Sequence, residues 1–329
     1  MTITRGKVHK YLGMTIDYSS PGKLIFLMIY YIIKMLDNIP EDMKGESATP
    51  DAHRPFDIAL GATKLFQADA DLCRHFVAQI LYLSKRSRPY IHIAVSFLCT
   101  RVIGPDAYDY KNLVRVMKSI QVTIELPLIL SIGKAVNINW YVHVAFAVHN
   151  DMRSHTGGFM TMGTAGAYMQ SSKQKLNIKN STDAELVGID YLLTQVIWTR
   201  YFLKEQGYII CHNDIYQDNQ SAIRLEKNGR RSRIKRTRHI NIRYYFITPR
   251  IIKQEASVEF FPTLDMIGDY FKKALKGSQL CQFRNIIIGI HEDDFPAYNS
   301  SGRDLIEEQK LILKKDKQES QEASKISGN

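Results

Sequence analysis

The chain has 329 residues and a mass of 37.8 kDa, which is enough for about two domains and excludes a peptide or a single small module. Apolar residues make up 45% and charged residues 23%, a composition that is typical of globular proteins and excludes a wholly disordered chain. Lys and Arg (44) outnumber Asp and Glu (33), and the net charge of +11 favours an anionic partner, either nucleic acid or an anionic membrane.

The cysteines indicate the redox environment of the chain, and the longest apolar run indicates whether a segment could span a membrane. The four cysteines form no C-x-x-C pair, so the sequence predicts neither a zinc site nor a disulfide framework, and we expect a reducing cytoplasmic or nuclear environment. The longest apolar run, 24–33, has ten residues, about half of what a bilayer span requires. The first residues are too polar for a secretory signal peptide. We therefore expect no membrane segment.

The region of about 1–130 combines short apolar runs with helical patterns. Prolines and the Gly-Glu-Ser-Ala-Thr segment at 45–49 indicate a loop between a short N-terminal unit and a helical block at 64–122. Apolar residues in that block recur at helical spacing in two places, which predicts two packed helices. These residues are Phe76, Ile80, Leu81 and Leu83, and then Leu113, Val116, Met117 and Ile120. We expect this region to be mainly helical.

The region of about 136–290 begins with strands. Strict alternation of side chains predicts a strand over 137–149, with His143 on one of its faces. Two further strands are expected at 156–162 and 167–173, and the glycines between them favour an antiparallel meander.

Helices and shorter strands follow the meander. Apolar residues with a period of 3.6 predict a helix over 183–205, which Gly207 ends. The later expected elements are a strand at 215–217, helices at 219–226 and 238–253, a strand at 258–261 and a helix at 264–275. The last region, 302–329, has as many basic as acidic residues and is rich in Ser, Gln and Lys. It is expected to be a disordered tail or a frayed helix.

Three carboxylates lie on successive predicted elements: Glu185 in the first turn of a helix, Asp218 at the end of a strand and Asp269 in a late helix. Hydrolysis of a phosphodiester by two Mg²⁺ ions requires such hard oxygen ligands. Each residue also has a simpler explanation. Glu185 completes a capping box with Thr182, Asp218 could cap the next helix, and a helical Asp269 would ordinarily face solvent.

Five short segments carry a family resemblance through their order and spacing. They are Ser154-His155-Thr156-Gly157-Gly158, Ser181-Thr182-Asp183-Ala184-Glu185-Leu186, Tyr216-Gln217-Asp218-Asn219-Gln220-Ser221-Ala222, Arg236-Thr237-Arg238-His239-Ile240 and Ile267-Gly268-Asp269-Tyr270-Phe271. Together they resemble the ribonuclease H domain of copia-type retrotransposon polyproteins. Upstream, Lys10-Tyr11-Leu12-Gly13-Met14 and Leu81-Tyr82-Leu83-Ser84-Lys85-Arg86 resemble segments that follow the polymerase palm in the same polyproteins.

The resemblance implies an α/β protein in two parts. Residues 136–290 would form a ribonuclease H-like, five-stranded mixed sheet flanked by helices, preceded over 1–130 by a truncated reverse-transcriptase remnant. Glu185, Asp218 and Asp269 would be catalytic and hold two Mg²⁺ ions, with Mn²⁺ as an alternative ion. The implied reaction is hydrolysis of the RNA strand of an RNA/DNA hybrid, with water as the nucleophile and no small-molecule cofactor.

The pattern breaks at the fourth catalytic carboxylate. The family has an Asp where this chain has His143, and imidazole brings no negative charge and suits zinc, copper or iron better than Mg²⁺. Asp151 lies past the expected strand end and is not expected to replace it. Lys272 and Ala274 stand where Thr and Pro are usual, a pattern that indicates drift. We therefore expect impaired hydrolysis, which His143→Asp should partly restore. No Tyr-x-Asp-Asp occurs, so the chain is not expected to polymerise by itself.

A basic cluster follows the second of the three carboxylates. It consists of Arg230, Arg231, Arg233, Lys235, Arg236 and Arg238. Its functional interpretation is contact with nucleic-acid phosphates, and its alternative is a solvated loop or a localisation-like patch. Two other functions stay open: a noncatalytic nucleic-acid-binding remnant, and a structural partner of an intact reverse transcriptase chain.

Overall fold

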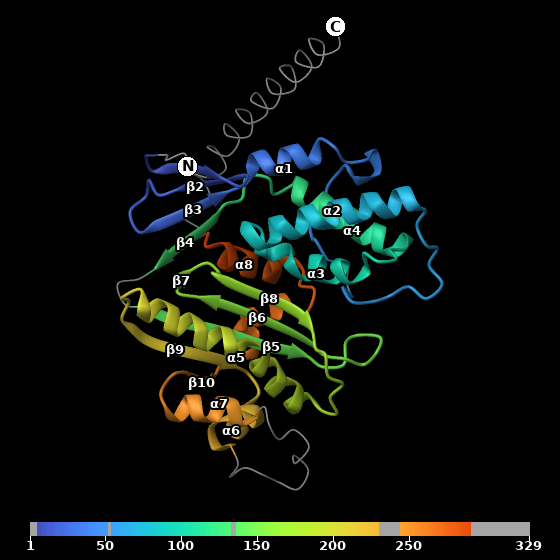
Figure 1. The fold of residues 1–329 in the computed structure, drawn as a ribbon. Helices are drawn as coiled ribbons and strands as arrows, with labels where there is room; N and C mark the ends of the chain where they lie inside the picture. The colour runs from blue at the N-terminus through green and yellow to red at the C-terminus, as the bar shows by residue number, and fades with distance from the viewer. Residues whose placement is uncertain (1–4, 52–53, 133–135, 230–243, 291–329) are drawn as a thin grey trace.

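The computed structural model describes residues 5–51, 54–132, 136–229 and 244–290. The predicted basic cluster and the predicted tail at 302–329 lie outside these ranges. The described residues form an α/β structure with two five-stranded sheets (Figure 1). This confirms the predicted α/β class. Among the described helices, none has the length and apolar character needed to cross a membrane.

The first sheet is antiparallel and was not predicted. Its order is β1 (Val8–Tyr11), β2 (Met14–Asp17), β3 (Lys23–Leu27), β4 (Leu128–Ile132) and β7 (Gly163–Thr164). Leu12 and Gly13 both have positive φ, 49° and 76°, which gives the tight turn between β1 and β2 a twist that suits a hairpin. Strands of two to five residues are too short to leave a clear alternation in the sequence.

The other regular elements described in the N-terminal region are helical. They are α1 (Ile29–Leu36), the 3₁₀ turn η1 (Glu41–Met43), α2 (Gln67–Arg86), the 3₁₀ turn η2 (Pro89–Ile91), α3 (His92–Arg101) and α4 (Ala107–Gln121). The block at 64–122 therefore contains three α-helices, and the prediction of two was wrong. Pro89 begins the short turn between α2 and α3, and a capping box of Asp106 and Asp109 begins α4.

The second sheet is mixed, with β5 at its centre. Its order is β10 (Ser257–Phe260), β9 (Ile210–Gln217), β5 (Val136–Ala145), β6 (His155–Thr161) and β8 (Tyr168–Lys173). The strands β10, β9 and β5 are parallel to one another, whereas β5, β6 and β8 form the predicted antiparallel meander. The central strand ends at Ala145 rather than 149, because Ala147 has a positive φ of 53°.

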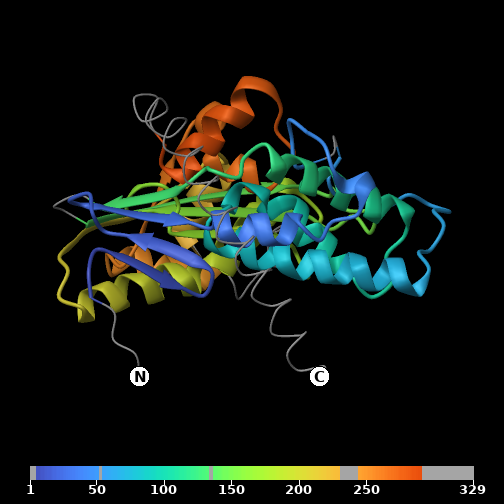
Figure 2. The same cartoon turned by 90° about the horizontal axis from the view of Figure 1, so that it is seen from above.

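Different elements cover the two faces of the strand layer. Helix α5 (Ser181–Glu205) lies on one side and α8 (Gly277–Ile288) on the other (Figure 2). Helices α6 (Gln220–Asn228) and α7 (Tyr244–Ile252) pack beside α5. The predicted helix over 264–275 was wrong, and α8 was not predicted.

Two 3₁₀ turns replace that predicted helix: η5 (Thr263–Asp265) and η6 (Ile267–Phe271). All five residues of η6 are buried, so this segment has no polar face of the kind that a surface helix presents to solvent. Gly268 further lowers its helix propensity. Tertiary packing therefore decides the local structure here.

Two large hydrophobic clusters contain most of the buried apolar side chains of the described residues. One lies between α5 and the second sheet and includes Trp140, Leu193 and Ile215. The other contains residues of the N-terminal region, such as Leu128, together with Phe271 near the C-terminal end. The predicted division at 130–136 is thus crossed by a shared core.

A close backbone approach fixes the segment that contains η6. A Cβ atom added to Gly157 of β6 would lie 2.5 Å from the carbonyl oxygen of Gly268, so Gly157→Ala should push this segment off the sheet. We expect a loss of about 1–3 kcal/mol of unfolding free energy, measurable by urea denaturation. Gly104→Ala is the control, since a Cβ there meets only Lys64 Nζ, at 3.6 Å. Equal effects of the two changes would contradict this packing.

Candidate active site at the end of strand β5

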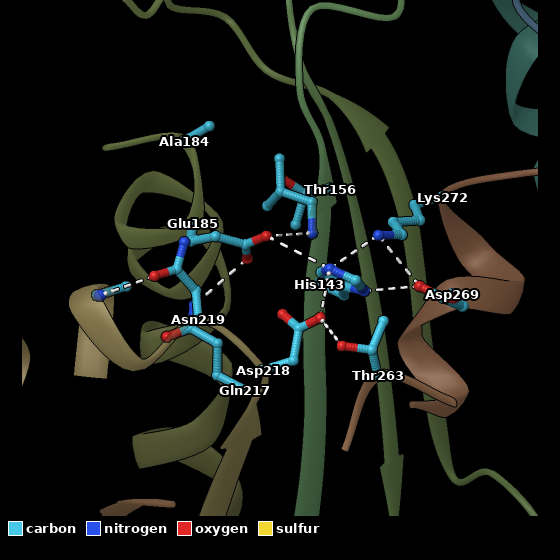
Figure 3. A network of polar contacts seen from close by, with 12 residues as sticks. His143, Thr156, Ala184, Glu185, Gln217, Asp218, Asn219, Thr263, Asp269 and Lys272 are labelled. Atoms are coloured by element: carbon cyan, nitrogen blue, oxygen red, sulfur yellow. Dashed lines mark hydrogen bonds and ion pairs between the residues drawn. The ribbon is translucent and has the colours of Figure 1, made fainter. Parts of the chain in front are cut away.

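Four residues identified from the sequence converge at one edge of the second sheet (Figure 3). His143 lies near the end of β5, Glu185 near the start of α5, Asp218 directly after β9 and Asp269 in η6. Because β5 and β9 are parallel, their carboxyl ends meet at the same edge, which is where α/β proteins commonly place functional groups.

His143 is the centre of this group. Its Nδ1 lies 2.6 Å from Asp269 Oδ1, and its Nε2 lies 3.1 Å from Asp218 Oδ2 and 3.6 Å from Glu185 Oε1. The side chain is buried. The position at which the resemblance implies a carboxylate thus contacts all three of the carboxyl groups named above.

Lys272 is a further member of the group. Its Nζ lies 2.8 Å from His143 Nε2 and 3.1 Å from Asp269 Oδ1, and the residue is only 8% exposed. Since an ammonium group has only donors, we assign Nε2 as the acceptor of the Lys272 hydrogen bond and place the imidazole proton on Nδ1, which then donates to Asp269 Oδ1. Burial lowers the pKa of the Lys272 amine, and the charge of Asp269 opposes this shift. The more exposed Lys273 contacts the other oxygen of Asp269.

The capping explanation for Glu185 is wrong. The residue that caps α5 is Asn180, whose side chain accepts the N–H of Asp183. Thr182 lies inside the helix. An asparagine side chain in extended backbone geometry at this position satisfies a free N–H of the first turn, which leaves Glu185 available for the site.

Glu185 instead reaches toward the strand ends. Its Oε1 accepts the N–H of Val144 at 3.2 Å, and its Oε2 accepts a hydrogen bond from Gln217 Nε2 at 3.3 Å. Burial raises the pKa of Glu185 to about 8; the charge of Lys272 opposes this rise, and the charge of Asp218 adds to it. Most Glu185 side chains are therefore protonated at neutral pH.

The simpler explanations for the two aspartates are also wrong. Asn219, not Asp218, caps α6 by accepting the N–H of Ala222, and Asp218 Oδ2 accepts a hydrogen bond from Thr263 Oγ1 at 2.7 Å. Asp269 is 1% exposed and does not face solvent. Burial by itself would raise its pKa, but the hydrogen bond from His143 and the nearby lysine ammonium groups hold the pKa below its usual range.

The sequence of the chain is similar to the sequences of several curated proteins. The chain is 28% identical over 146 residues to the retrovirus-related Pol polyprotein of transposon TNT 1-94 from Nicotiana tabacum. It is also similar to the corresponding polyproteins of Arabidopsis thaliana transposons RE2, with 28% identity over 231 residues, and RE1, with 26% over 284 residues. The chain is thus similar, at low identity, to Pol polyproteins from copia-type transposons.

The extent of these matches differs between the chain and its relatives. They cover 44, 69 and 85% of the chain, but only 11, 16 and 19% of the three polyproteins. The chain thus spans less than a fifth of each of these Pol polyproteins. No family model and no solved structure matches it. The expected resemblance to copia-type Pol polyproteins is confirmed.

The described side chains do not fit the pair of Mg²⁺ ions that the Pol resemblance implies. One nitrogen of His143 and one oxygen each of Glu185 and Asp218 lie within 4.8 Å of one another, a spacing that by itself suits a cation. However, His143 Nε2 already accepts a hydrogen bond from Lys272, and imidazole is a poor Mg²⁺ ligand. An ion at this position would have to displace an ammonium group.

Other predicted residues lie away from the site. Asp151 contacts Lys173 at 2.6 Å and Arg153 at 3.5 Å in the loop after β5, so it does not replace the missing carboxylate, as expected. Sequence reasoning missed Lys272 as a site residue. Its departure from the family pattern was the available signal, but the pattern did not connect it with His143.

The raised pKa of Glu185 makes stability depend on pH. The folded chain keeps a proton up to a pH of about 8, whereas an unfolded Glu releases it near 4.5. This stabilising contribution is complete below pH 4.5 and is lost as the pH rises to about 8. Glu185→Gln should remove the loss. Its unfolding free energy, relative to the unmodified chain, should rise by up to about 1.4 kcal/mol per pH unit in this window.

Urea denaturation across this pH range measures the effect. The matched control is Glu205→Gln, since Glu205 is exposed at the end of the same helix. Parallel stability profiles for both variants and the unmodified chain would contradict the buried, protonated state of Glu185.

Proposed function

We propose that the chain is a ribonuclease H-type module derived from a retrotransposon Pol polyprotein, which binds RNA/DNA hybrids and is impaired in hydrolysing the RNA strand. The observation that carries this proposal is the convergence of Glu185, Asp218 and Asp269 around His143. These residues come from four elements that are distant in sequence, and each occupies a position of the family motif. A solvated helix face or a cap would not bring them together.

The order of the second sheet supports the fold part of the proposal. The antiparallel meander comes first in the chain, and two further parallel strands extend the sheet from β5. Helix α5 covers one face and contributes Glu185, while η6 covers the other and contributes Asp269. This is the five-stranded mixed sheet flanked by helices that the resemblance implies.

The charges of the site support impaired hydrolysis. Two bound Mg²⁺ ions would supply an activated water and stabilise the attacking and leaving oxygens. Here His143 replaces one carboxylate, Glu185 holds a proton at neutral pH, and Lys272 adds an internal cation. Both the number of anionic ligands and the net negative charge are lower than two divalent ions require. The net charge of +11 favours retained binding of nucleic acid, so a noncatalytic binding remnant is the second candidate.

A hybrid-cleavage assay tests the proposed function. Loss of one shared ligand costs several kcal/mol of transition-state stabilisation, or roughly a thousandfold in rate, so we expect at most slow cleavage with Mg²⁺. Any residual activity should be greater with Mn²⁺, which tolerates nitrogen ligands better, and should disappear in Asp218→Asn. Cleavage that persists unchanged in Asp218→Asn, or failure to bind the hybrid at all, would contradict the proposal.

Salt-dependent binding tests the basic cluster, which lies outside the described residues. Each phosphate contact adds about 0.9 to the slope of log affinity against log salt concentration. Replacing Arg230, Arg231 and Arg233 by Ala should therefore flatten the slope by about 2 to 3, as measured by fluorescence anisotropy. The control removes the same charge from exposed Lys7, Lys10 and Lys34. An equal change in both triple variants would exclude a localised interface.

A further inference from the structure

Two departures from the family pattern meet in the structure. His143 and Lys272 are 129 positions apart, yet Lys272 Nζ lies 2.8 Å from His143 Nε2 (Figure 3). We propose that the Lys272 ammonium replaces a divalent cation as the counter-charge of the carboxyl cluster, so that this centre is complete without metal. The inference rests on the proposed function because it takes the site to be of ribonuclease H type.

The Lys272 side chain is held in place from two directions. Its Nζ donates to His143 on β5 and to Asp269 in η6, at 2.8 and 3.1 Å. Its own backbone N–H donates to the Asp269 carbonyl oxygen at 3.2 Å, which fixes where the side chain leaves the turn. With 8% of its surface exposed, the residue is part of the interior. A surface lysine that moves freely in solvent would not make all of these contacts at the same time.

The two departures also match in charge. Relative to the family pattern, a neutral His in place of Asp removes one negative charge, and Lys in place of Thr adds one positive charge. Their sum is the charge of one divalent cation. Lys273, which is more exposed, contacts the other oxygen of Asp269. Lys272 adds the buried cation of the cluster, which contacts both Asp269 and His143.

The same contacts oppose metal binding. The three groups whose spacing suits a cation are His143, Glu185 and Asp218, and His143 offers Nε2, the atom that already accepts from Lys272. A metal ion would have to break this hydrogen bond and then lie beside an ammonium group, and like charges at such distances repel strongly in a buried site. His143→Asp alone should therefore restore metal binding only weakly, because Lys272 would pair with the introduced carboxylate.

Metal binding by four variants tests this inference. The variants are His143→Asp, Lys272→Thr, the double variant, and Lys276→Thr as a control that removes an exposed lysine close by. Isothermal titration calorimetry with MnCl₂ and MgCl₂, and the electron paramagnetic resonance of Mn²⁺, report binding without any need for activity. We expect saturable binding in the double variant, on the order of tenfold or more tighter than in His143→Asp. The unmodified chain and Lys276→Thr should show none.

Two results would overturn the inference. One is saturable Mn²⁺ binding by the unmodified chain, and the other is equal affinity in His143→Asp and the double variant. If the double variant does not fold, labelling of lysines in the unmodified chain gives a second measurement. Lys272 should react with an amine-directed acylating reagent much more slowly than Lys276, with no change on adding Mn²⁺. Equal labelling rates, or loss of protection with Mn²⁺, would overturn the inference as well.

Hybrid binding by the same preparations separates this inference from the proposed function. A chain that excludes Mn²⁺ but does not bind RNA/DNA hybrids contradicts the proposed function and supports the role of Lys272. A chain that binds hybrids and also binds Mn²⁺ saturably supports the proposed function and contradicts the role of Lys272.

Discussion

The charges buried at the end of β5 must be compensated from within the chain. Glu185, Asp218 and Asp269 all lie within hydrogen-bond or ion-pair distance of one imidazole, and unpaired buried carboxylates are strongly unfavourable. The structure meets this constraint in two ways. Asp269 stays ionised beside His143 and two lysines, whereas Glu185, with only neutral donors at its oxygens, takes up a proton. The packing of side chains at the ends of β5 and β9 depends on both the ionised Asp269 and the protonated Glu185.

The need to compensate these buried charges links two departures from the family pattern, His143 and Lys272. Taken singly, His143 and Lys272 are two departures from the pattern that the resemblance implies. In the structure they share a hydrogen bond, so each makes the other tolerable: the lysine supplies the charge that a metal would have supplied, and the imidazole supplies an acceptor for the lysine. Drift without such compensation would leave a buried ammonium or a buried carboxylate cluster without a partner, which costs several kcal/mol. The two departures are therefore compatible with a packed core.

Local patterns in the sequence predicted the elements whose periodicity is long and regular. The strands β5, β6 and β8 and the 25-residue helix α5 are of this kind, and the carboxylates were found because they belong to spaced motifs. The N-terminal sheet was missed because its strands are too short to show a clear alternation of side chains. The turn η6 was missed because all of its residues are buried, so the sequence shows no alternation of polar and apolar faces there. The contact between Lys272 and His143 could not be predicted, since only the fold brings positions 129 residues apart together.

The N-terminal region has a direct connection with the site, although it contributes no carboxylate to it. Tyr270 and Phe271 precede Lys272 and belong to the same hydrophobic cluster as Ile91 and Leu128. Residues of α3 and α8 also pack against η6. The segment that contains Asp269 and Lys272 thus packs on β5 and β6 as part of a core to which both regions contribute. Because Gly157 has no side chain, the backbone of this segment can lie close to β6. The N-terminal region therefore takes part in fixing the geometry of the candidate site, which gives a physical reason for the two regions to remain joined.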